Sequence, residues 1–357
     1  MDMVRPARVA DLEALLHLAT LTGFGLTTLP RDPEFLRKRL AESERSFAHL
    51  NEEPRGEPYL FVLESGAGGE VVGTSAILSK VGGFEPFYAY RVETKVHESK
   101  MLDVRKEIPV LHLVREHSGP SEIGGLFLAP AHRDSGRGRL LSRSRFLFMA
   151  EHPSTFDAEV LSEIRGVSDE RGESPFWEAV GRKFFDIDFP KADYLSLLNK
   201  RFIADLMPTH PLYLPLLPPE AQAVIGEAHP QSRGALKLLV DEGFQPSGMV
   251  DIFDAGPIVR ARVEELRAVR DSARAVIEKV GTSKAHGETF LVCRVGAKAE
   301  FRAAIGHVEK VGDGGIRVSA ALAERLEVRA RDEVRLTPVR GSAPGEVRRE
   351  AHGEVRS

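Results

Sequence analysis

The chain has 357 residues, 42% of them hydrophobic, and its 49 basic residues against 53 acidic residues leave a net charge of −4. This length predicts about two domains, and the charge excludes the basic surface of a general nucleic-acid-binding or membrane-coating protein. The single cysteine, Cys293, excludes an internal disulfide and a zinc site built from several cysteines. No apolar run approaches the roughly 20 residues of a membrane span, and no signal peptide is recognisable, so we expect a cytoplasmic protein.

The first half of the chain alternates between predicted strands and helices. Apolar or alternating runs predict strands at 4–6, 59–64, 71–78, 87–93, 111–114, 122–128 and 160–165. Helices are expected at 12–19 and 34–46, separated by a loop rich in Gly, Thr and Pro at 22–33. A further helix is expected at 139–150, with leucines and phenylalanines on one face and Arg139, Arg143 and Arg145 on or near the other.

The second half begins with a helix near Pro175, and the five prolines between 208 and 219 predict irregular structure. A helix at 232–242 should end at Gly243, and a strand is expected at 249–253. We expect a charged helical segment at 258–278, and then short strands from 288 with a helix at 320–326. This order predicts an α+β domain at 1–256 with a helical and proline-rich insertion. A linker helix and small mainly-β subdomain should follow at 257–340, and a disordered tail at 341–357.

A glycine-rich loop, RDSGRGR, follows the predicted strand at 122–128 and opens the helix at 139–150. Glycines let backbone N–H groups point inward, and a helix N-terminus adds positive potential, so this arrangement predicts a phosphate site. A dinucleotide loop would need Gly or Ala where this chain has Leu141, and the Gly-Lys-Ser/Thr tripeptide of a Walker loop is absent here. The remaining match, Arg133-x-x-Gly136-x-Gly138, is similar to the pyrophosphate loop of GNAT acyltransferases. A glycine-rich turn that binds nothing is the alternative interpretation.

Longer stretches of the chain resemble one enzyme family, the arginine N-succinyltransferases. The resemblance runs from about residue 4 to residue 339 and is carried by VRPARVADLEALLHLATLTGFGLTTLP, YRVETKVHESK, FLAPAHRDSGRGRLLSRSRFLFMA, EIRGVSDERGESPFWEAVGRKFF, LMPTHPLYLPLLPPEAQAVIGEAHPQ and EGFQPSGMVDIFDAGP. It implies a GNAT-type fold with an extra C-terminal mainly-β subdomain. It also implies transfer of succinyl from succinyl-CoA to the α-amine of L-arginine, the first step of an arginine catabolic route. Succinyl-CoA is then a co-substrate, and neither a permanent cofactor nor a metal is implied.

The resemblance also assigns roles to two positions of this chain. The family's proton donor falls on His229, and its succinyl-CoA contact falls on Leu126. Just before that contact the chain departs from the family, because Gly124-Gly125 stands where family members have Cys-Thr. We expect Leu126, Phe127 and Leu128 to bind the pantetheine arm through their backbone groups. A solvated loop histidine is the alternative interpretation for His229, and His210 is its competitor as proton donor.

The phosphate loop and the substrate site supply the remaining candidates. The loop's candidates for binding coenzyme A are Arg133, Ser135, Gly136, Arg137, Gly138 and Arg139, and Arg143 could also meet its phosphates or be exposed. Arginine's guanidinium needs carboxylates, and its α-carboxylate needs basic groups or backbone donors. Both kinds of side chain occur in the stretch that holds Glu163, Arg165, Asp169 and Glu170, although each of these could equally lie on a solvated surface.

Three other functions stay open from the sequence. The same chemistry could use ornithine or another amine, or the chain could be a non-catalytic coenzyme A-binding subunit paired with a similar chain. A weaker alternative is an acyltransferase that acts on protein lysines. The partners that we expect are succinyl-CoA and L-arginine, with a homo-oligomer or a heteromer with a paralogous subunit as possible assemblies.

Overall fold

The computed structural model describes residues 1–22, 28–66, 68–133, 136–281, 288–296, 300–312 and 314–339. The predicted tail at 341–357 and Ser135 of the glycine loop lie outside this part of the chain. The described strands form one continuous sheet in the order β12-β15-β11-β14-β13-β1-β2-β3-β6-β7-β10-β9-β4-β5-β8. No described helix combines the length and the apolar character that a membrane crossing requires.

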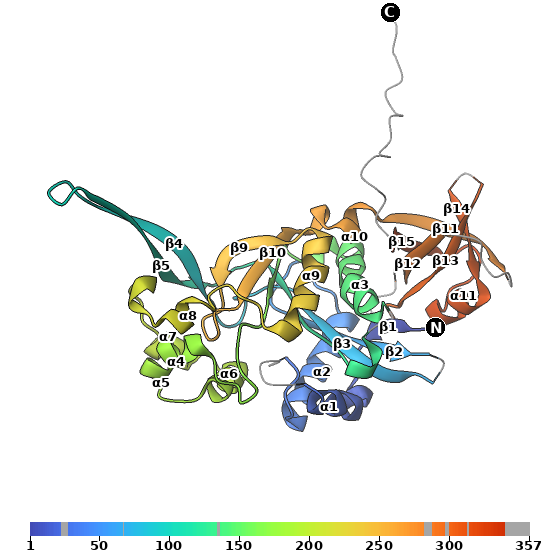
Figure 1. Cartoon of the computed structure of the whole chain (residues 1–357). Coiled ribbons are helices and arrows are strands. Elements are labelled where there is room, and N and C mark those ends of the chain that lie inside the picture. Colours follow the sequence, from blue (N-terminus) through green and yellow to red (C-terminus); the bar gives the residue numbers. More distant parts are fainter. Residues whose placement is uncertain are drawn as a thin grey trace, which may run out of the picture.

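The part of the sheet built from the N-terminal strands lies between helices (Figure 1). Along β2, Leu60 and Val62 pack toward one set of helices while Phe61 and Leu63 pack toward α3, because successive side chains of a strand alternate between faces. The elements are β1 (Met3–Pro6), α1 (Leu12–Thr20), α2 (Pro33–Ala48), β2 (Pro58–Ser65), β3 (Glu70–Leu78), β6 (Ser121–Leu128), α3 (Arg137–Glu151) and β7 (Glu159–Glu163). The α+β class is therefore confirmed.

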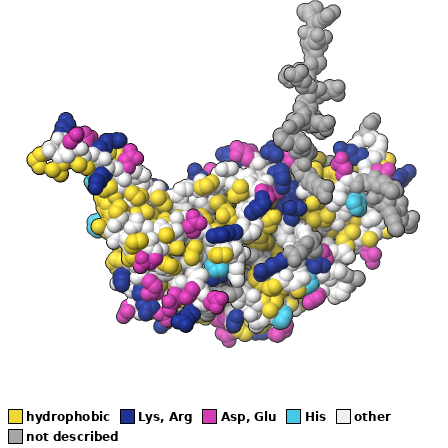
Figure 2. Space-filling model, in the orientation of Figure 1, with side chains coloured by type: hydrophobic (Ala, Val, Ile, Leu, Met, Phe, Trp, Pro, Cys, Tyr) yellow, Lys and Arg dark blue, Asp and Glu magenta, His cyan; other side chains and the backbone are white. Residues whose placement is uncertain are grey.

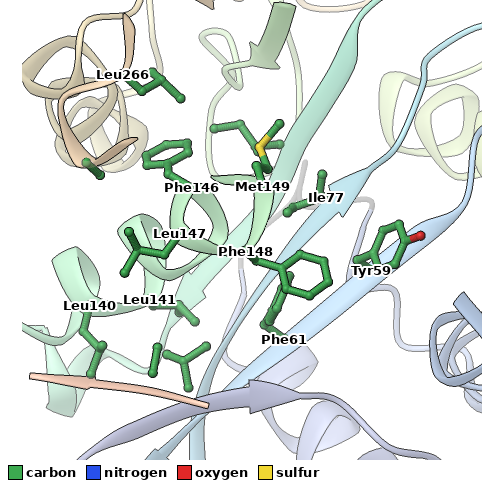
Figure 3. Close-up of a cluster of buried hydrophobic side chains, with 14 of the residues drawn as sticks. Tyr59, Phe61, Ile77, Leu140, Leu141, Phe146, Leu147, Phe148, Met149 and Leu266 are labelled. Atoms are coloured by element: carbon green, nitrogen blue, oxygen red, sulfur yellow. The ribbon is translucent and has the colours of Figure 1, made fainter. Parts of the chain in front are cut away.

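Helix α3 lies at the centre of the largest hydrophobic core (Figure 3). The ring of Phe148 meets Phe47, Phe61 and Phe301 edge to face, with ring centroids 5.1–5.4 Å apart. The prediction that Arg143 and Arg145 lie on a polar face of this helix is wrong, because they are 2% and 1% exposed. The sheet covers one side of α3, and strands β12 and β13 with α10 cover other sides, so little of it reaches solvent.

A helical insertion packs a second core around Trp177. It comprises α4 (Pro175–Ala179), α5 (Gly181–Phe185), α6 (Phe189–Leu198), α7 (Arg201–Leu206) and α8 (Pro219–Gln222). Within the proline-rich segment only a two-residue strand, β8 (Leu212–Tyr213), is regular strand, and it pairs with β5. The chain then runs through α9 (Arg233–Glu242) into β9 (Gln245–Val250) and rejoins the sheet.

Two strands are much longer than the sequence predicts. Strands β4 (Phe87–Ser99) and β5 (Val104–Glu116) pair along their whole length and project from the body as an arm (Figure 1). Figure 2 shows hydrophobic side chains at the tip of this arm, where Met101 and Leu102 are 90% and 66% exposed. Most side chains of the outer arm are at least partly exposed, so the inward–outward alternation that identifies a strand is weak there.

The prediction of a charged helix at 258–278 is wrong. This segment forms β10 (Pro257–Arg262), the short helix α10 (Arg267–Arg270) and β11 (Ala273–Gly281). Strand β10 pairs with β7 and β9, and it buries Ile258 and Val259 while Arg260 and Arg262 are exposed. Charges on one face of a short strand resemble the polar face of a helix, which explains the error. The boundary at 256 stays a prediction, although the strand that follows it belongs to the central sheet.

The C-terminal part is a small barrel, which confirms the expected mainly-β region. Each of its five strands pairs with two others, so the sheet closes on itself in the order β12-β15-β11-β14-β13-β12. The remaining elements are β12 (Glu288–Arg294), β13 (Ala303–Val311), β14 (Gly315–Ser319), α11 (Ala320–Leu326) and β15 (Glu333–Pro338). Cys293 lies on β12 and is fully buried, with its side chain in the core around α3.

Candidate active site

Strands β6 and β7 diverge and open a wedge in the sheet. They run parallel and pair only at Ser121 with Val160 and at Glu122 with Leu161. Beyond this point side chains replace the missing strand partner. The Ile123 carbonyl accepts a hydrogen bond from Ser162 Oγ at 2.9 Å, and the Gly124 carbonyl accepts one from Arg145 Nη1 at 3.3 Å. From Gly125 onward, β7 no longer pairs with the backbone of β6.

A bulge in β6 lies directly beside this wedge. Against β3, the register passes from Thr74–Phe127 to Ala76–Gly124, so two residues of β6 oppose Ser75. Gly125 has a φ of +59°, which glycine adopts without strain, and a Cβ there would lie 3.2 Å from Thr28 Oγ1. The departure from the family at Gly124-Gly125 thus lies at the bulge, which the glycine at 125 allows. The neighbouring Leu126 and Phe127 are half-buried and Leu128 is buried.

The glycine loop begins helix α3 beyond the end of β6. Gly136 is the N-cap with a φ of +77°, and Gly138 has open space around it, with Leu238 Cδ1 3.9 Å from the position of a Cβ. Arg137 is not directed at a ligand, because its guanidinium binds the Asp2 carboxylate at 2.8 Å. Further contacts of the loop's arginines are Arg137 to Ser65 Oγ at 3.0 Å and Arg133 Nε to the Leu128 carbonyl at 3.0 Å, whereas Arg139 is exposed.

A cavity of about 410 Å³ opens beneath the point where the strands diverge. Its wall comes from α2, β6, α3, β7, α6, α9 and the loop at 251–254, so segments far apart in the sequence meet here. The charged residues that line it are Arg39, Glu85, Glu122, Arg145, Glu163, Arg165, Asp193, Lys200, Asp251 and Asp254.

Five carboxylates of this cavity have raised pKa values because burial disfavours their charged forms. For Glu163 and Asp254 the pKa lies well above its usual range, and for Asp193 burial and the nearby Asp251 raise it to about 8. The pKa values of Glu122 and Asp251 are raised as well, again mainly by burial. A cationic ligand would stabilise the charged forms of these groups.

The five carboxylates differ in how they are held. Asp254 accepts hydrogen bonds from the backbone N–H groups of Gly166 and Gly256 at 2.7 and 2.8 Å, and Asp251 accepts two from its own loop. Among the described residues, by contrast, no hydrogen bond and no ion pair within 4.0 Å reaches the carboxylates of Glu122, Glu163 and Asp193. These three are therefore available to a ligand. No group of His, Cys, Asp and Glu in the described ranges is arranged to hold a metal ion.

His229 is not one of the described residues that line this cavity, but its backbone is bonded to Arg165, which does line it. Its backbone N–H donates to the Arg165 carbonyl at 2.9 Å, and an isolated bridge joins Ala228 to Gly166, so the segment is fixed to the end of β7. Its Nδ1 accepts a hydrogen bond from the Gln231 N–H at 3.2 Å. Partial burial and the positive charge of Arg165 lower the pKa of His229, so its ring is neutral at pH 7. His210 is exposed on the proline-rich segment.

The structure separates the four substrate-binding candidates. Glu163 and Arg165 line the cavity, whereas Asp169 and Glu170 are exposed, and the Asp169 carboxylate caps its own turn by accepting from the Arg171 N–H at 2.9 Å. Sequence reasoning missed Arg39, Glu122, Asp193, Lys200, Asp251 and Asp254 as lining residues, and it placed Arg145 on the surface. A charged residue inside the apolar strand at 122–128 was the one signal that could have identified Glu122.

Comparisons with known proteins agree with this arrangement. The family profile "Arginine N-succinyltransferase beta subunit" matches residues 2–268, and the profile of its C-terminal domain matches residues 273–338. The chain is 45% identical over 352 residues to "Arginine N-succinyltransferase subunit beta" of Pseudomonas aeruginosa, covering 96% of this chain and 100% of that one. It is 43% identical to "Arginine N-succinyltransferase" of Salmonella schwarzengrund, covering 94% and 97%.

A solved structure gives the same result for the fold. It is described as arginine/ornithine succinyltransferase subunit AI from Pseudomonas aeruginosa, and it superposes with a TM-score of 0.87 at 39% identity. The match covers 96% of this chain and 99% of that chain, barrel included. The expected GNAT-type fold with an extra C-terminal β region is thereby confirmed, and so is an acyltransferase enzyme. This chain belongs to the arginine N-succinyltransferase family.

Proposed function

We propose that this enzyme transfers succinyl from succinyl-CoA to the α-amine of L-arginine in the cytoplasm, as a step of arginine catabolism. The observation that carries the proposal is the cavity at the diverging strands, which opens beside strand backbone that β7 leaves unpaired and carries both unpaired carboxylates and basic groups. L-Arginine presents a guanidinium and an α-carboxylate, so it needs groups of both signs.

The two ends of coenzyme A fit two features that the sequence predicts. The pantetheine arm would lie along β6 at Leu126, Phe127 and Leu128 and pair with the backbone that β7 leaves free. The pyrophosphate would bind at the N-terminus of α3, where Gly136 and Gly138 leave room and exposed Arg139 adds charge. Arg133 and Arg137 would act by holding the loop, since their guanidinium groups already bind the protein.

The amino-acid substrate would bind in the cavity under the helical insertion. Glu163 and Asp193, which accept no hydrogen bond from the described residues, would take the guanidinium. Lys200 or Arg39, on the same wall, would face the α-carboxylate. This arrangement leaves the α-amine directed toward the acyl group at the bulge. The guanidinium would also lower the raised pKa values of the two carboxylates, which stabilises the complex.

The reaction is a direct aminolysis in a ternary complex. The neutral α-amine attacks the thioester carbonyl carbon, so a C–N bond forms and the C–S bond breaks with its electron pair on sulfur. The ring of His229 is neutral, so it takes the proton that the amine loses and returns it to the departing thiolate. No acyl-enzyme is required, and Cys293 is fully buried in the core between β12 and α3.

The test is thiol release by the purified chain with succinyl-CoA and a panel of amines: L-arginine, L-ornithine and a lysine peptide. We expect turnover with L-arginine by the chain alone. A preference for ornithine or for the peptide would contradict the proposed substrate. Binding of succinyl-CoA with no turnover until a paralogous chain is added would favour the subunit alternative.

A pair of histidine variants tests the proposed proton transfer. His229→Ala should lower kcat by about 10²- to 10⁴-fold, the usual contribution of general acid–base catalysis, with smaller changes in the KM values. His210→Ala is the matched control, because His210 is exposed outside the cavity. Lost turnover in the control with unchanged turnover in His229→Ala would show that the wrong histidine is assigned.

A further inference from the structure

Arg145 is a buried cation without a counter-ion. Its side chain is 1% exposed in the middle of α3, and no carboxylate of the described residues lies within 4.0 Å of it. Its near neighbour Arg143 is 2% exposed, and its charge is neutralised by an ion pair with Glu242 at 2.9 Å. Burial of a charge without a partner is costly, so an unpaired buried guanidinium that lines a cavity indicates an anionic ligand.

The hydrogen bonds of Arg145 leave donors for such a ligand. Nε and Nη2 donate to the carbonyl and Oγ of Ser142 at 3.1 Å each, and Nη1 donates to the Gly124 carbonyl at 3.3 Å. A guanidinium has five N–H groups, so two of them meet no acceptor in the described part of the chain. Because both Nη atoms retain a free N–H, a carboxylate could bind them in the bidentate manner.

The other basic groups of the cavity are compensated by nearby acids. The charge of Glu122 acts on both Arg39 and Lys200, and the charges of Asp254 and Asp193 act on Arg165. Burial alone shifts Arg145, lowering its pKa to about 9, and no carboxylate offsets that shift. Arg145 is therefore the lining cation on which an incoming anion would gain the most.

The position of Arg145 fits one particular anion. The carbonyl that it binds belongs to Gly124, two residues before Leu126, which is about 6–7 Å along a strand. In succinyl-CoA the distal carboxylate carbon lies about 4 Å from the thioester carbon, across three carbon–carbon bonds, and a carboxylate–guanidinium hydrogen bond adds about 3 Å. An acyl group whose thioester lies at the bulge thus has the reach to bring its carboxylate to Arg145.

We propose that Arg145 binds the distal carboxylate of the acyl group and makes the enzyme selective for succinyl-CoA over acyl donors that lack this charge. The proposal rests on the acyl-CoA site proposed above and adds to it the residue that recognises the acyl chain. Arg145 is then a specificity residue, and it takes no part in proton transfer.

The test compares two donors of equal chain length, succinyl-CoA and butyryl-CoA, with L-arginine as acceptor. For the wild type we expect kcat/KM to be about 100-fold higher with succinyl-CoA, and Arg145→Gln should remove most of this ratio by losing activity with succinyl-CoA alone. Arg145→Lys keeps a charge with fewer donors and should keep part of the ratio. Arg143→Gln is the matched control: it should lower the melting temperature and leave the ratio unchanged.

The outcomes distinguish a failure of the proposed role of Arg145 from a failure of the proposed function. Absence of wild-type turnover with succinyl-CoA and any amine would overturn the proposed function. A wild type that uses both donors equally, or a folded Arg145→Gln variant that keeps the wild-type ratio, would overturn the role of Arg145 while the function stands. The wild-type comparison requires no variant to fold.

Discussion

Helix α3 carries two buried arginines that are treated differently by the structure around them. Arg143 points to the junction with the barrel, where it pairs with Glu242 and donates to the Pro338 carbonyl at 2.9 Å. Arg145 points to the cavity and has no acidic partner within 4.0 Å among the described residues. A buried charge with a purely structural role is neutralised by a counter-ion from the protein, whereas a buried charge that binds a ligand has no such counter-ion in the free protein.

The same contrast extends to the two regions that these arginines face. At the barrel junction, Glu151 pairs with Arg274 at 2.8 Å and with Arg335, and Glu64 pairs with Arg5 and Arg325. Among the described residues that line the cavity, no ion pair within 4.0 Å joins the carboxylates to the basic groups. Substitutions at the junction should therefore affect stability, and substitutions in the cavity should affect ligand binding.

The largest effect on stability should come from breaking the junction pair. Glu242→Gln should lower the free energy of unfolding by about 3–5 kcal/mol, because it leaves the Arg143 guanidinium buried without a counter-ion. Urea denaturation measures the change. Asp241→Asn, on the same helix in an exposed pair with Lys237, should cost less than about 1 kcal/mol. Equal losses in the two variants would remove the distinction between buried and exposed pairs.

In the cavity, the largest effect should be on substrate binding. Glu163→Gln should raise the KM for L-arginine by about 10- to 100-fold, because an amide cannot neutralise the guanidinium, and it should leave the melting temperature unchanged or higher. Steady-state kinetics with saturating succinyl-CoA measure it. Glu170→Gln is the control, since that side chain is exposed, and an equal rise in both variants would contradict the assignment.

A smaller effect concerns the pH dependence of stability. With its pKa raised to about 8, Asp193 keeps a proton in the folded protein that the unfolded chain loses above about pH 4. The folded state binds more protons, so this group lowers stability progressively as the pH rises from about 4 to 8. Asp193→Asn should lose less melting temperature than the wild type between pH 5 and pH 9. The exposed Asp205→Asn should follow the wild type, and identical curves for all three would argue against a raised pKa of Asp193.

The smallest effect on turnover is expected from substituting Cys293, because this residue does not line the cavity. Burial raises the pKa of this thiol, so the native protein should resist thiol reagents. Cys293→Ala should leave kcat unchanged within about twofold, because the transfer uses no acyl-enzyme. A loss of turnover without a loss of stability would reopen a covalent mechanism.

Much of the fold follows from local sequence patterns, and much of the cavity does not. The paired strands β2 and β3, the end of α9 at Gly243 and the glycine loop were predicted because their signals lie within short windows. The cavity draws its charges from segments of the chain as separate as α2, β7 and α6. Each such residue alone resembles a surface charge, and only tertiary packing buries it.

The burial of Arg143 and Arg145 on α3 could not be predicted from the local sequence either. Their charge suggested solvent exposure, but the barrel, which begins more than a hundred residues later, covers Arg143, and the walls of the cavity enclose Arg145. His229 became a candidate only through the family resemblance, since nothing in its local sequence distinguishes it from the other histidines.

Strand β1, at the start of the chain, pairs with strands that are synthesised at very different times. One edge of β1 pairs with β2, while the other pairs Val4 with Ala303 of the barrel. At translation rates of about 5–20 residues per second, the second edge stays open on the order of ten seconds or more after β2 has been made. An unpaired strand edge invites association with other chains. The nascent protein is thus exposed to misassembly until strand β13 emerges. Shortening the N-terminus would remove this pairing and leave the barrel held by α3 and the ion pairs of Glu151.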